Sequence, residues 1–245
     1  QVTGRQTNAR AELAAVLHVL RTEARPVTVR SDCRYVVDGF NYRNVTVNSA
    51  TGLSAGPTLQ HALSLLEQKL TDPPVVPDGQ LYGAYVAAMN EAYAERLCGF
   101  GDTPEGAIPS CTPHLNVVDR EGNVVALTQT LLSLFGSKVV LPETGILMNN
   151  GMMWFDPIPG RANSIAPGKR PLSNMCPVII CDPAGCRTAI GASGGRRIMS
   201  AVLQILSFMV DCQMTVHDAM RQPRIDVSGG TDITIDTLLD PDIVE

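Results

Sequence analysis

The spacing of apolar residues predicts helices along much of the chain. Apolar side chains that recur every three or four positions mark one face of a helix. This spacing predicts helices over 9–21, 58–70, 81–97, 197–210 and 216–220, and residues 34–40 read as the start of a further helix. The longest of these, 81–97, has the strongest helical pattern.

A different pattern, alternation of apolar and polar residues, predicts strands in the second half. Segments 115–119 and 124–130 alternate, and the polar, glycine-containing residues 120–123 between them predict a hairpin turn. Further strands are predicted at 27–31, 145–149, 176–181 and 188–192. Segments rich in Asn, Ser, Thr, Gly or Pro predict loops at 41–57, 71–79 and 99–110. Strand runs followed by helices favour a layered α/β fold.

Composition narrows the class of protein. Hydrophobic residues make up 44% of the 245 residues and charged residues 18%, which permits a sizeable core. The net charge of −5 argues against a nucleic-acid partner, because phosphate binding needs clustered Lys and Arg. No apolar stretch reaches the ~20 residues that cross a bilayer, so no membrane partner is expected. The polar first ten residues are unlike a secretory signal peptide.

The cysteine spacing predicts free thiols. Cys176, Cys181 and Cys186 lie five positions apart, which matches no CxxC metal signature. The seven cysteines, an odd number with irregular spacing, are interpreted as thiols of a reducing compartment. A cytoplasmic location and no metal or other cofactor are therefore expected.

Thr112 stands where an N-terminal nucleophile would stand. In that mechanism a Ser, Thr or Cys becomes the first residue of a new chain, and its own amine serves as general base. Such a residue should follow a loop and open a strand. Thr112 lies between the predicted loop 99–110 and the hairpin strand that begins at 115. An ordinary strand threonine would occupy the same kind of position, so the surrounding sequence has to decide.

Five sequence blocks follow one another from Thr112 onwards. They are Thr112-Pro113-His114-Leu115 with Val117-Val118-Asp119-Arg120-Glu121-Gly122-Asn123, Gly145-Ile146-Leu147-Met148-Asn149-Asn150-Gly151-Met152, Ala166-Pro167-Gly168-Lys169-Arg170-Pro171-Leu172-Ser173, Gly191-Ala192-Ser193-Gly194-Gly195-Arg196-Arg197-Ile198 and Asp218-Ala219-Met220-Arg221-Gln222-Pro223-Arg224. Their order and spacing resemble the catalytic half of the gamma-glutamyltranspeptidase family. The resemblance covers about 78–228 and includes 85–101, which is similar to the end of that family's large subunit.

The resemblance implies a fold, a reaction and a set of site residues. The fold would be a layered αββα sandwich of the N-terminal-nucleophile hydrolase type, with self-cleavage before Thr112. The implied catalytic residues are Thr112, Thr130, Gly194 and Gly195, and the implied substrate-binding residues are Ser173, Asn174 and Trp154. Thr112 would attack, Thr130 would orient it, and the two glycine N–H groups would hold the oxyanion. Ser173 would bind a substrate carboxylate.

Three positions depart from the family pattern. Pro113 replaces a second Thr after the nucleophile, Leu132 replaces an Asn, and Trp154 replaces an acidic residue that holds the substrate's α-amino group. The last two changes remove partners for an ammonium group and weaken the case for gamma-glutamyl specificity. Trp154 could instead shape an apolar acyl pocket. Most of the family's large subunit, including the Arg that binds the substrate carboxylate, is absent from this sequence.

The first residues resemble a different family. Gly4-Arg5-Gln6-Thr7-Asn8-Ala9-Arg10-Ala11-Glu12-Leu13 and the strand at 27–31 with Asp32 resemble ribonuclease H. Glu12 and Asp32 would then be two of its metal-binding carboxylates. Two-metal hydrolysis needs a larger set of carboxylates than these two. An equally good interpretation is that Glu12 is a solvated helix residue and Asp32 a strand-end residue.

These observations divide the chain into a ribonuclease H-like α/β fragment at 1–44, a linker with a short helix at 45–77, and a gamma-glutamyltranspeptidase-like region at 78–245. The expected activity is hydrolysis or transfer of a gamma-glutamyl or related acyl group from a small amide or peptide such as a glutathione-like compound. A second chain could complete the fold, since an exposed sheet edge invites pairing. The alternatives are a metal-dependent ribonuclease H-type nuclease and a catalytically inactive fusion or subunit. The family resemblance also allows a secreted or periplasmic location.

Overall fold

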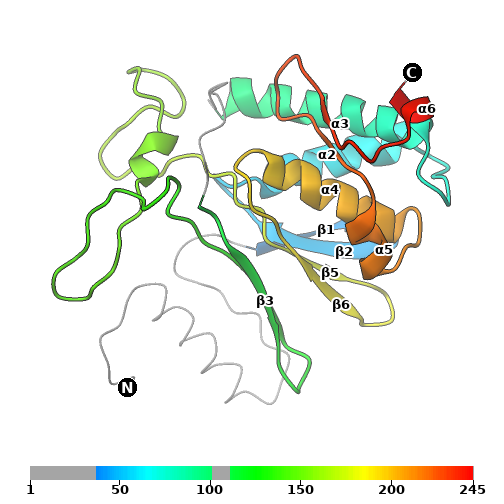
Figure 1. Cartoon of the computed structure of the whole chain (residues 1–245), viewed down its shortest axis with the longest axis horizontal. Coiled ribbons are helices and arrows are strands. Elements are labelled where there is room, and N and C mark those ends of the chain that lie inside the picture. Colours follow the sequence, from blue (N-terminus) through cyan, green and yellow to red (C-terminus); the bar gives the residue numbers. More distant parts are fainter. Residues whose placement is uncertain (1–36, 101–110, 245) are drawn as a thin grey trace.

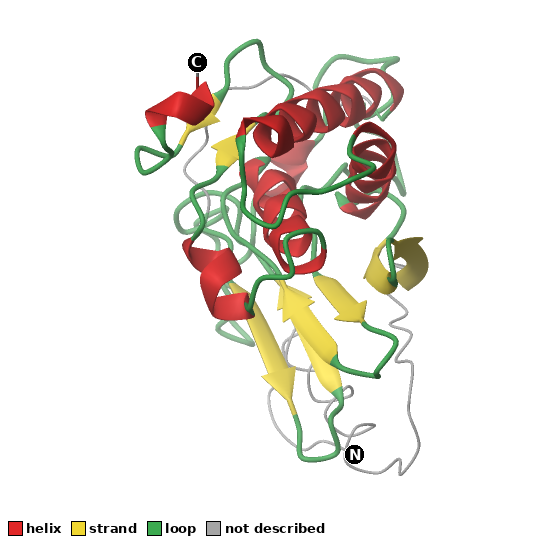
Figure 2. Cartoon of the chain, turned by 90° about the vertical axis from the view of Figure 1, so that its right-hand side faces the viewer, coloured by secondary structure: helices red, strands yellow, loops and turns green. Residues whose placement is uncertain are grey.

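The computed structural model describes residues 37–100 and 111–244. An antiparallel sheet of four strands carries three longer helices on one side, and a hairpin packs beside the sheet (Figure 1). Figure 2 shows the same arrangement from the side, with the helices above the strands. The predicted α/β class is confirmed.

The sheet joins parts of the chain that lie far apart in sequence. Its strands are β1 (Val37–Tyr42), β2 (Val45–Ala50), β5 (Val178–Cys181) and β6 (Arg187–Ile190), in the order β1-β2-β5-β6. The β2–β5 contact, with Val47 opposite Ile180, therefore connects the first third of the chain to the last third.

The first two strands correct the sequence prediction. Residues 34–40 were expected to start a helix and 41–57 to form a loop, and both predictions are wrong for the part described here. In β2, Val45, Val47 and Ser49 are buried in strict alternation with less buried neighbours. This period of two was hidden by composition, because the strand carries Thr46 and Asn48 at intervening positions and a polar Ser49 on the buried face. Thr46 and Asn48, which indicated a loop, lie on the less buried face of a strand.

Three helices cover one face of the sheet. They are α2 (Gly56–Lys69), α3 (Gly79–Gly99) and α4 (Arg197–Val210). Helix α3 begins after Asp78, whose carboxylate accepts a hydrogen bond from the N–H of Leu81 at 2.9 Å and caps the first turn. All three helices were predicted within two residues of their ends. None of the helices described is long and apolar enough to cross a membrane.

The remaining elements are short. The hairpin consists of β3 (His114–Val118) and β4 (Val124–Thr128), as predicted. Beyond α4 follow α5 (Val216–Arg221), β7 (Ile225–Asp226), β8 (Thr234–Ile235) and α6 (Pro241–Val244). The strand predicted at 145–149 is wrong: only a single bridge joins Leu147 to Val140. A tight turn at Gly145, with φ of 69°, folds this segment back on itself instead.

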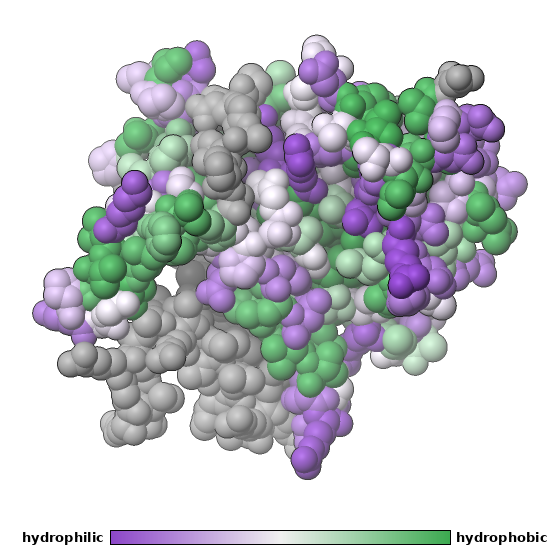
Figure 3. All heavy atoms as spheres, viewed as in Figure 1, coloured by the Kyte–Doolittle hydropathy of each residue, from purple (hydrophilic) through white to green (hydrophobic). Residues whose placement is uncertain are grey.

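The loops between β4 and β5 carry an apolar surface. They include a short 3₁₀ helix, Gly151–Trp154. Large hydrophobic side chains gather on this projecting part of the molecule (Figure 3). The most exposed are Leu134, Phe135, Met152, Val139, Ile165, Val140 and Met153. Apolar patches of this kind are typical of surfaces that contact another polypeptide.

A buried carboxylate ties the β1–β2 turn to the end of α4. Asp211 accepts hydrogen bonds from the Tyr42 hydroxyl at 2.5 Å, from Arg43 Nε at 2.9 Å and from the Ser207 hydroxyl. The Asp211 side chain is 0% exposed, and that of Arg43 is 20% exposed. Burial and the neighbouring carboxylate raise the pKa of Tyr42 well above its ordinary value, so the phenol stays a donor.

Replacing Asp211 with alanine should therefore destabilise the fold. The change leaves Arg43 and Tyr42 without their acceptor, and breaking a buried pair in this way costs about 3 kcal/mol or more. The measurement is urea unfolding followed by circular dichroism. Asp72→Ala, at an exposed position, is the control and should shift the free energy of unfolding by less than about 0.5 kcal/mol. Equal effects of the two substitutions would contradict a structural role for Asp211.

Candidate active site

Thr112 and Thr130 form a hydrogen-bonded pair at the open end of the hairpin. His114 pairs with Thr128 in the β3–β4 register, and two residues further along Thr112 meets Thr130. Their hydroxyl oxygens are 2.9 Å apart. The backbone N–H of Leu132 also donates to the Thr130 hydroxyl at 2.8 Å. The Thr130 oxygen is therefore held from two sides, next to the Thr112 side chain.

The peptide bond between Cys111 and Thr112 is held by residues 130–132, next to the threonine pair. The carbonyl oxygen of Cys111 accepts from the Leu131 N–H at 3.3 Å and from the Thr130 hydroxyl at 3.3 Å. The Cys111 N–H donates to the Leu132 carbonyl at 2.9 Å. Two donors thus converge on the one carbonyl oxygen that would gain negative charge if Thr112 attacked the bond.

His114 connects the hairpin to the segment that leads into the glycine turn. Its ring nitrogens lie 2.7 Å from the Thr128 hydroxyl and 2.8 Å from Asn116 Oδ1. Asn116 in turn donates to the Ala189 carbonyl of β6 at 3.0 Å. A Cβ added to Gly191 would lie 2.1 Å from the histidine ring, so only glycine permits this approach.

The glycine turn precedes α4. Gly194 and Gly195 have φ angles of 125° and 64°, which other residues adopt only with strain. Their carbonyls accept from the N–H groups of Arg197 and Ile198, both at 3.3 Å, so the turn continues into the helix. The buried Tyr93 of α3 donates its hydroxyl to the Arg196 carbonyl at 2.6 Å. The turn is therefore attached to α3 as well as to α4.

The loop with Ser173 and Asn174 is held by residues near the start of α2. The Ser173 N–H donates to the Leu53 carbonyl at 2.8 Å, and the Ala55 N–H donates to the Met175 carbonyl at 3.2 Å. Arg96 of α3 donates to the Ser173 carbonyl at 2.9 Å and to Asn174 Oδ1 at 2.8 Å. The segment predicted as a linker thus helps to hold a candidate substrate-binding loop.

Asn163 joins this loop to Trp154. Its side-chain amide donates to the Trp154 carbonyl at 2.6 Å and accepts from the Leu172 N–H at 3.1 Å. The Trp154 ring packs on Gly151, where an added Cβ would lie 3.0 Å from the ring. Trp154 is half-buried, which leaves part of its side chain open to a ligand.

The family model for gamma-glutamyltranspeptidase matches residues 106–237, more than half of the chain. The chain belongs to the gamma-glutamyltranspeptidase family. The match contains both threonines of the hydrogen-bonded pair, the loop at Ser173 and the glycine turn. A ribonuclease H model matches residues 1–73.

Curated relatives include both hydrolases and acylases. The glutathione hydrolase proenzyme of Bacillus subtilis (strain 168) is 39% identical over 124 residues, which are 51% of this chain and 21% of the relative. The acylase ACY 1 proenzyme of Pseudomonas sp. (strain SE83) is 43% identical over 119 residues, 49% of this chain and 21% of the relative. The chain therefore spans about a fifth of the length of these two gamma-glutamyltranspeptidase-like relatives.

The fold is shared with a solved acylase. The crystal structure of cephalosporin acylase from Bacillus halodurans superposes with a TM-score of 0.71, covering 85% of this chain and 44% of that chain at 20% identity. Residues 78–245 are only 69% of the chain, so the shared fold also includes residues before 78. This agrees with strand β2, which lies before residue 78 and pairs with β5 in the sheet. The boundaries at 44 and 77 as such stay a prediction.

In this gamma-glutamyltranspeptidase family member, the structure brings four of the seven predicted residues together in two pairs, and Gly194, Gly195 and Trp154 lie outside them. Thr112 and Thr130 touch each other, and Ser173 and Asn174 share Arg96. Glu12 and Asp32 lie outside the described residues. Within the described ranges, no group of three or more His, Cys, Asp or Glu side chains could hold a metal.

Four supporting residues were not found by sequence reasoning, namely Arg96, Tyr93, His114 and Asn163. Tyr93 and Arg96, the two on α3, could have been noticed, because their polar groups stand at core-facing positions of a strongly helical segment. Burial raises the pKa of the Cys176 thiol to about 12, which disfavours the thiolate form that a nucleophile needs.

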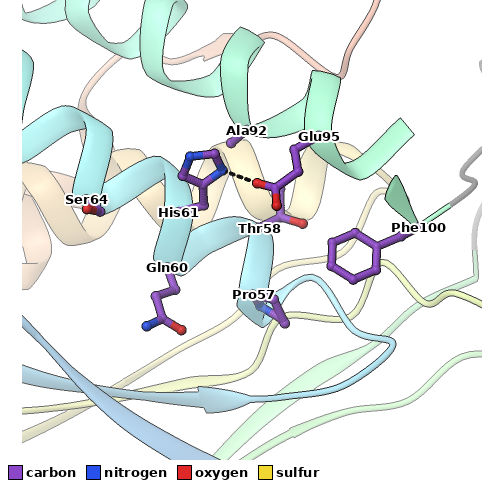
Figure 4. A pocket seen from close by; sticks show the side chains of 8 residues that line it. All are labelled: Pro57, Thr58, Gln60, His61, Ser64, Ala92, Glu95 and Phe100. Carbon is purple, nitrogen blue, oxygen red and sulfur yellow. Dashed lines mark ion pairs between the residues drawn. The ribbon is translucent and has the colours of Figure 1, made fainter. Parts of the chain in front are cut away.

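A separate hollow of about 390 Å³ lies between α2 and α3. It is lined by Pro57, Thr58, Gln60, His61, Ser64, Ala92, Glu95 and Phe100 (Figure 4). His61 Nδ1 and Glu95 Oε2 pair across it at 2.5 Å. None of the predicted site residues lines this hollow.

Proposed function

We propose that the chain is an N-terminal threonine hydrolase and acyltransferase that cleaves a gamma-glutamyl or related acyl amide through an ester on Thr112. The observation that carries this proposal is the Thr112–Thr130 pair beside the Cys111 carbonyl. The Thr112 hydroxyl donates to the Thr130 hydroxyl, which in turn donates to the Cys111 carbonyl, so both side chains lie at the bond to be cleaved.

The first reaction is self-cleavage. Thr112 Oγ attacks the Cys111 carbonyl carbon, and the resulting oxyanion is stabilised by the Leu131 N–H and the Thr130 hydroxyl, which already contact that oxygen. The C–N bond then breaks, the Thr112 nitrogen takes the proton that the Thr112 hydroxyl gave up on attack, and Cys111 is left as an ester on Thr112 Oγ. Water hydrolyses the ester and releases a carboxylate at Cys111 and a free N-terminus at Thr112.

The same residues support the second reaction, on a substrate. The free Thr112 amine accepts the hydroxyl proton while Oγ attacks the substrate amide. The N–H groups of Gly194 and Gly195 stabilise the oxyanion, and the amide nitrogen leaves with the proton. Water or an amine then takes the acyl group and restores Thr112. No step in this sequence requires a cofactor.

The substrate class follows from the relatives and from the site. The relatives are a glutathione hydrolase and an acylase, so a small acyl amide or a glutathione-like peptide is the proposed substrate. Both relatives are proenzymes. The apolar loops between β4 and β5 support a further proposal, that a second chain covers them.

Mass spectrometry of the intact, purified protein tests the proposal. Cleavage should yield two fragments whose masses, less one water, sum to that of the 26.2 kDa chain, with Thr112 at the new N-terminus. Only the uncut chain, with no hydrolysis of any acyl anilide supplied, would contradict the proposed function.

The ribonuclease H-like segment should show no nuclease activity of its own. Glu12 and Asp32 are only part of the carboxylate set that two-metal hydrolysis needs. The measurement is release of labelled nucleotides from an RNA–DNA hybrid with added magnesium or manganese. Activity that disappears in both Glu12→Gln and Asp32→Asn would make a nuclease the main function.

A further inference from the structure

Side chains of strand β3 join the hairpin to β6 and to the segment that follows it. Asn116 donates to the Ala189 carbonyl of β6 at 3.0 Å. Two residues closer to Thr112, the His114 ring packs against Gly191, directly after β6. The contact between His114 and Gly191 is therefore the one that lies nearest to Thr112 on the hairpin and nearest to the glycine turn on the other side.

The hydrogen bonds of His114 determine which of its ring nitrogens carries the proton. The NH₂ group of Asn116 is used on Ala189, so the oxygen Oδ1 of Asn116 faces His114 Nε2, at 2.8 Å. An amide oxygen only accepts, and Nε2 must therefore be the donor. Nδ1 is then the acceptor, and the Thr128 hydroxyl donates to it at 2.7 Å. The ring is held by hydrogen bonds at both nitrogens.

Gly191 leaves room for this ring and for no side chain of its own. The three atoms nearest to an added Cβ all belong to the His114 ring, which the Cβ would overlap. Gly191 does not have a positive φ, so its backbone alone would accept alanine. Because the ring is fixed to the hairpin, it acts as a spacer that sets how closely the segment at Gly191 approaches the strand after Thr112.

The glycine turn is fixed on its other side by α3. There the Tyr93 hydroxyl donates to the Arg196 carbonyl at 2.6 Å. In the proposed hydrolysis, the two glycine N–H groups of the turn have to meet the oxyanion that forms when Thr112 attacks. A displacement of about 1 Å between such groups can cost about 10²-fold in rate. The spacing at Gly191 therefore matters for the reaction.

We propose that His114 is a positioning residue whose ring, seated on Gly191, holds the glycine turn in line with Thr112. This inference rests on the proposed function, because it assigns how the oxyanion donors are aligned with the nucleophile. It also separates the two reactions. Self-cleavage takes its oxyanion donors from Thr130 and Leu131 and does not use the glycine turn, whereas hydrolysis of an acyl amide does.

A double-mutant cycle with a glutaryl anilide as substrate tests the proposal. Gly191→Ala should lower kcat about a hundredfold, because the added methyl displaces the ring or the turn, and self-cleavage measured by intact mass should be normal. His114→Ala removes the spacer without adding a clash and should lower kcat only about tenfold. In the double variant the methyl occupies the space of the ring, so kcat should return to the value of His114→Ala alone.

Gly83→Ala and His217→Ala are the matched controls. Both residues are exposed, and a Cβ added to Gly83 meets nothing within 4 Å. Neither substitution should change either reaction by more than about twofold. A merely structural role for His114 would slow self-cleavage and hydrolysis alike, so the ratio of the two rates distinguishes positioning from loss of stability.

Hydrogen exchange followed by mass spectrometry detects the same contact without turnover. Peptides that cover residues 191–196 should exchange at least about threefold faster in Gly191→Ala than in the wild-type protein. In the double variant they should exchange at the rate found for His114→Ala. Exchange in peptides from the hairpin should be the same in Gly191→Ala and in the wild-type protein.

The outcomes separate this inference from the proposed function. Normal hydrolysis by Gly191→Ala, or losses that multiply in the double variant, would overturn the role of His114. If Gly191→Ala does not fold, His114→Ala decides in its place, since unchanged hydrolysis and unchanged exchange at 191–196 would also overturn it. A wild-type protein that hydrolyses no acyl amide would contradict the proposed function, and the exchange measurements would then decide on His114 alone.

Discussion

Thr112→Ala should yield a single uncut chain with no measurable amide hydrolysis. The substitution removes the oxygen that attacks both the Cys111 carbonyl and the substrate, and loss of a nucleophile typically costs at least about 10⁴-fold in kcat. Thr130→Val should slow both reactions by about 10²-fold, because Thr130 contacts the Thr112 hydroxyl and the Cys111 carbonyl without forming a bond itself. Self-cleavage is followed by intact mass and hydrolysis by release of an aniline.

Two further variants make the comparison specific. Thr112→Ser retains a hydroxyl and should retain cleavage at the same bond. Thr46→Val is the control. The Thr46 hydroxyl donates to Asn41 Oδ1 at 3.4 Å on the exposed side of β2, so this variant should behave as the wild-type protein. Normal turnover by Thr112→Ala would exclude Thr112 as the nucleophile.

The second large effect concerns the acyl donor. Trp154 and Leu132 stand where the family has partners for the substrate's α-amino group, and an ammonium without a partner costs several kcal/mol when buried. The wild-type protein should therefore hydrolyse a glutaryl anilide faster than the gamma-glutamyl anilide, by about tenfold or more in kcat/KM. Trp154→Asp supplies a carboxylate and should reverse this preference.

Side-by-side kinetics with the two anilides measures this directly. Trp154→Phe is the control, because it retains an aromatic ring without adding charge and should retain the glutaryl preference. A wild-type preference for the gamma-glutamyl compound would mean that another residue contacts the ammonium group. A Trp154→Asp variant with the unchanged glutaryl preference would place Trp154 outside the acyl-donor site.

The parts of the fold that local patterns specify were predicted well. The hairpin His114–Val118 with Val124–Thr128 and the helix Arg197–Val210 have strong periodicity within one segment, so neighbouring residues determine them. Strands β1 and β2 were missed because their polar residues match loop composition. Strand β2 pairs with its neighbour β1 on one side and with β5, more than a hundred residues away, on the other. A single sequence gives little sign of the second pairing.

The candidate site also contains residues that the sequence could predict and residues that it could not. The contact between Thr112 and Thr130 could be predicted because the two residues flank the strands of one hairpin, and Thr112 also opens a recognisable sequence block. Arg96 could not, because the groups that accept its hydrogen bonds include residues at the start of α2 and in the loop at Ser173, which are distant in sequence. In the sequence it is one more polar residue on a long helix. Its importance depends on tertiary packing, which propensity and periodicity do not describe.

The β2–β5 pairing affects how the protein would unfold and refold after the proposed self-cleavage. Strand β2 lies before the Cys111–Thr112 bond and β5 lies after it, so a cut there divides the sheet between two polypeptides. Folding of the intact precursor is a first-order process, whereas reassembly of separated fragments is second order and becomes slower on dilution. Once heated, the mature form should recover poorly, and its lifetime should be governed by the rate of fragment separation rather than by an equilibrium.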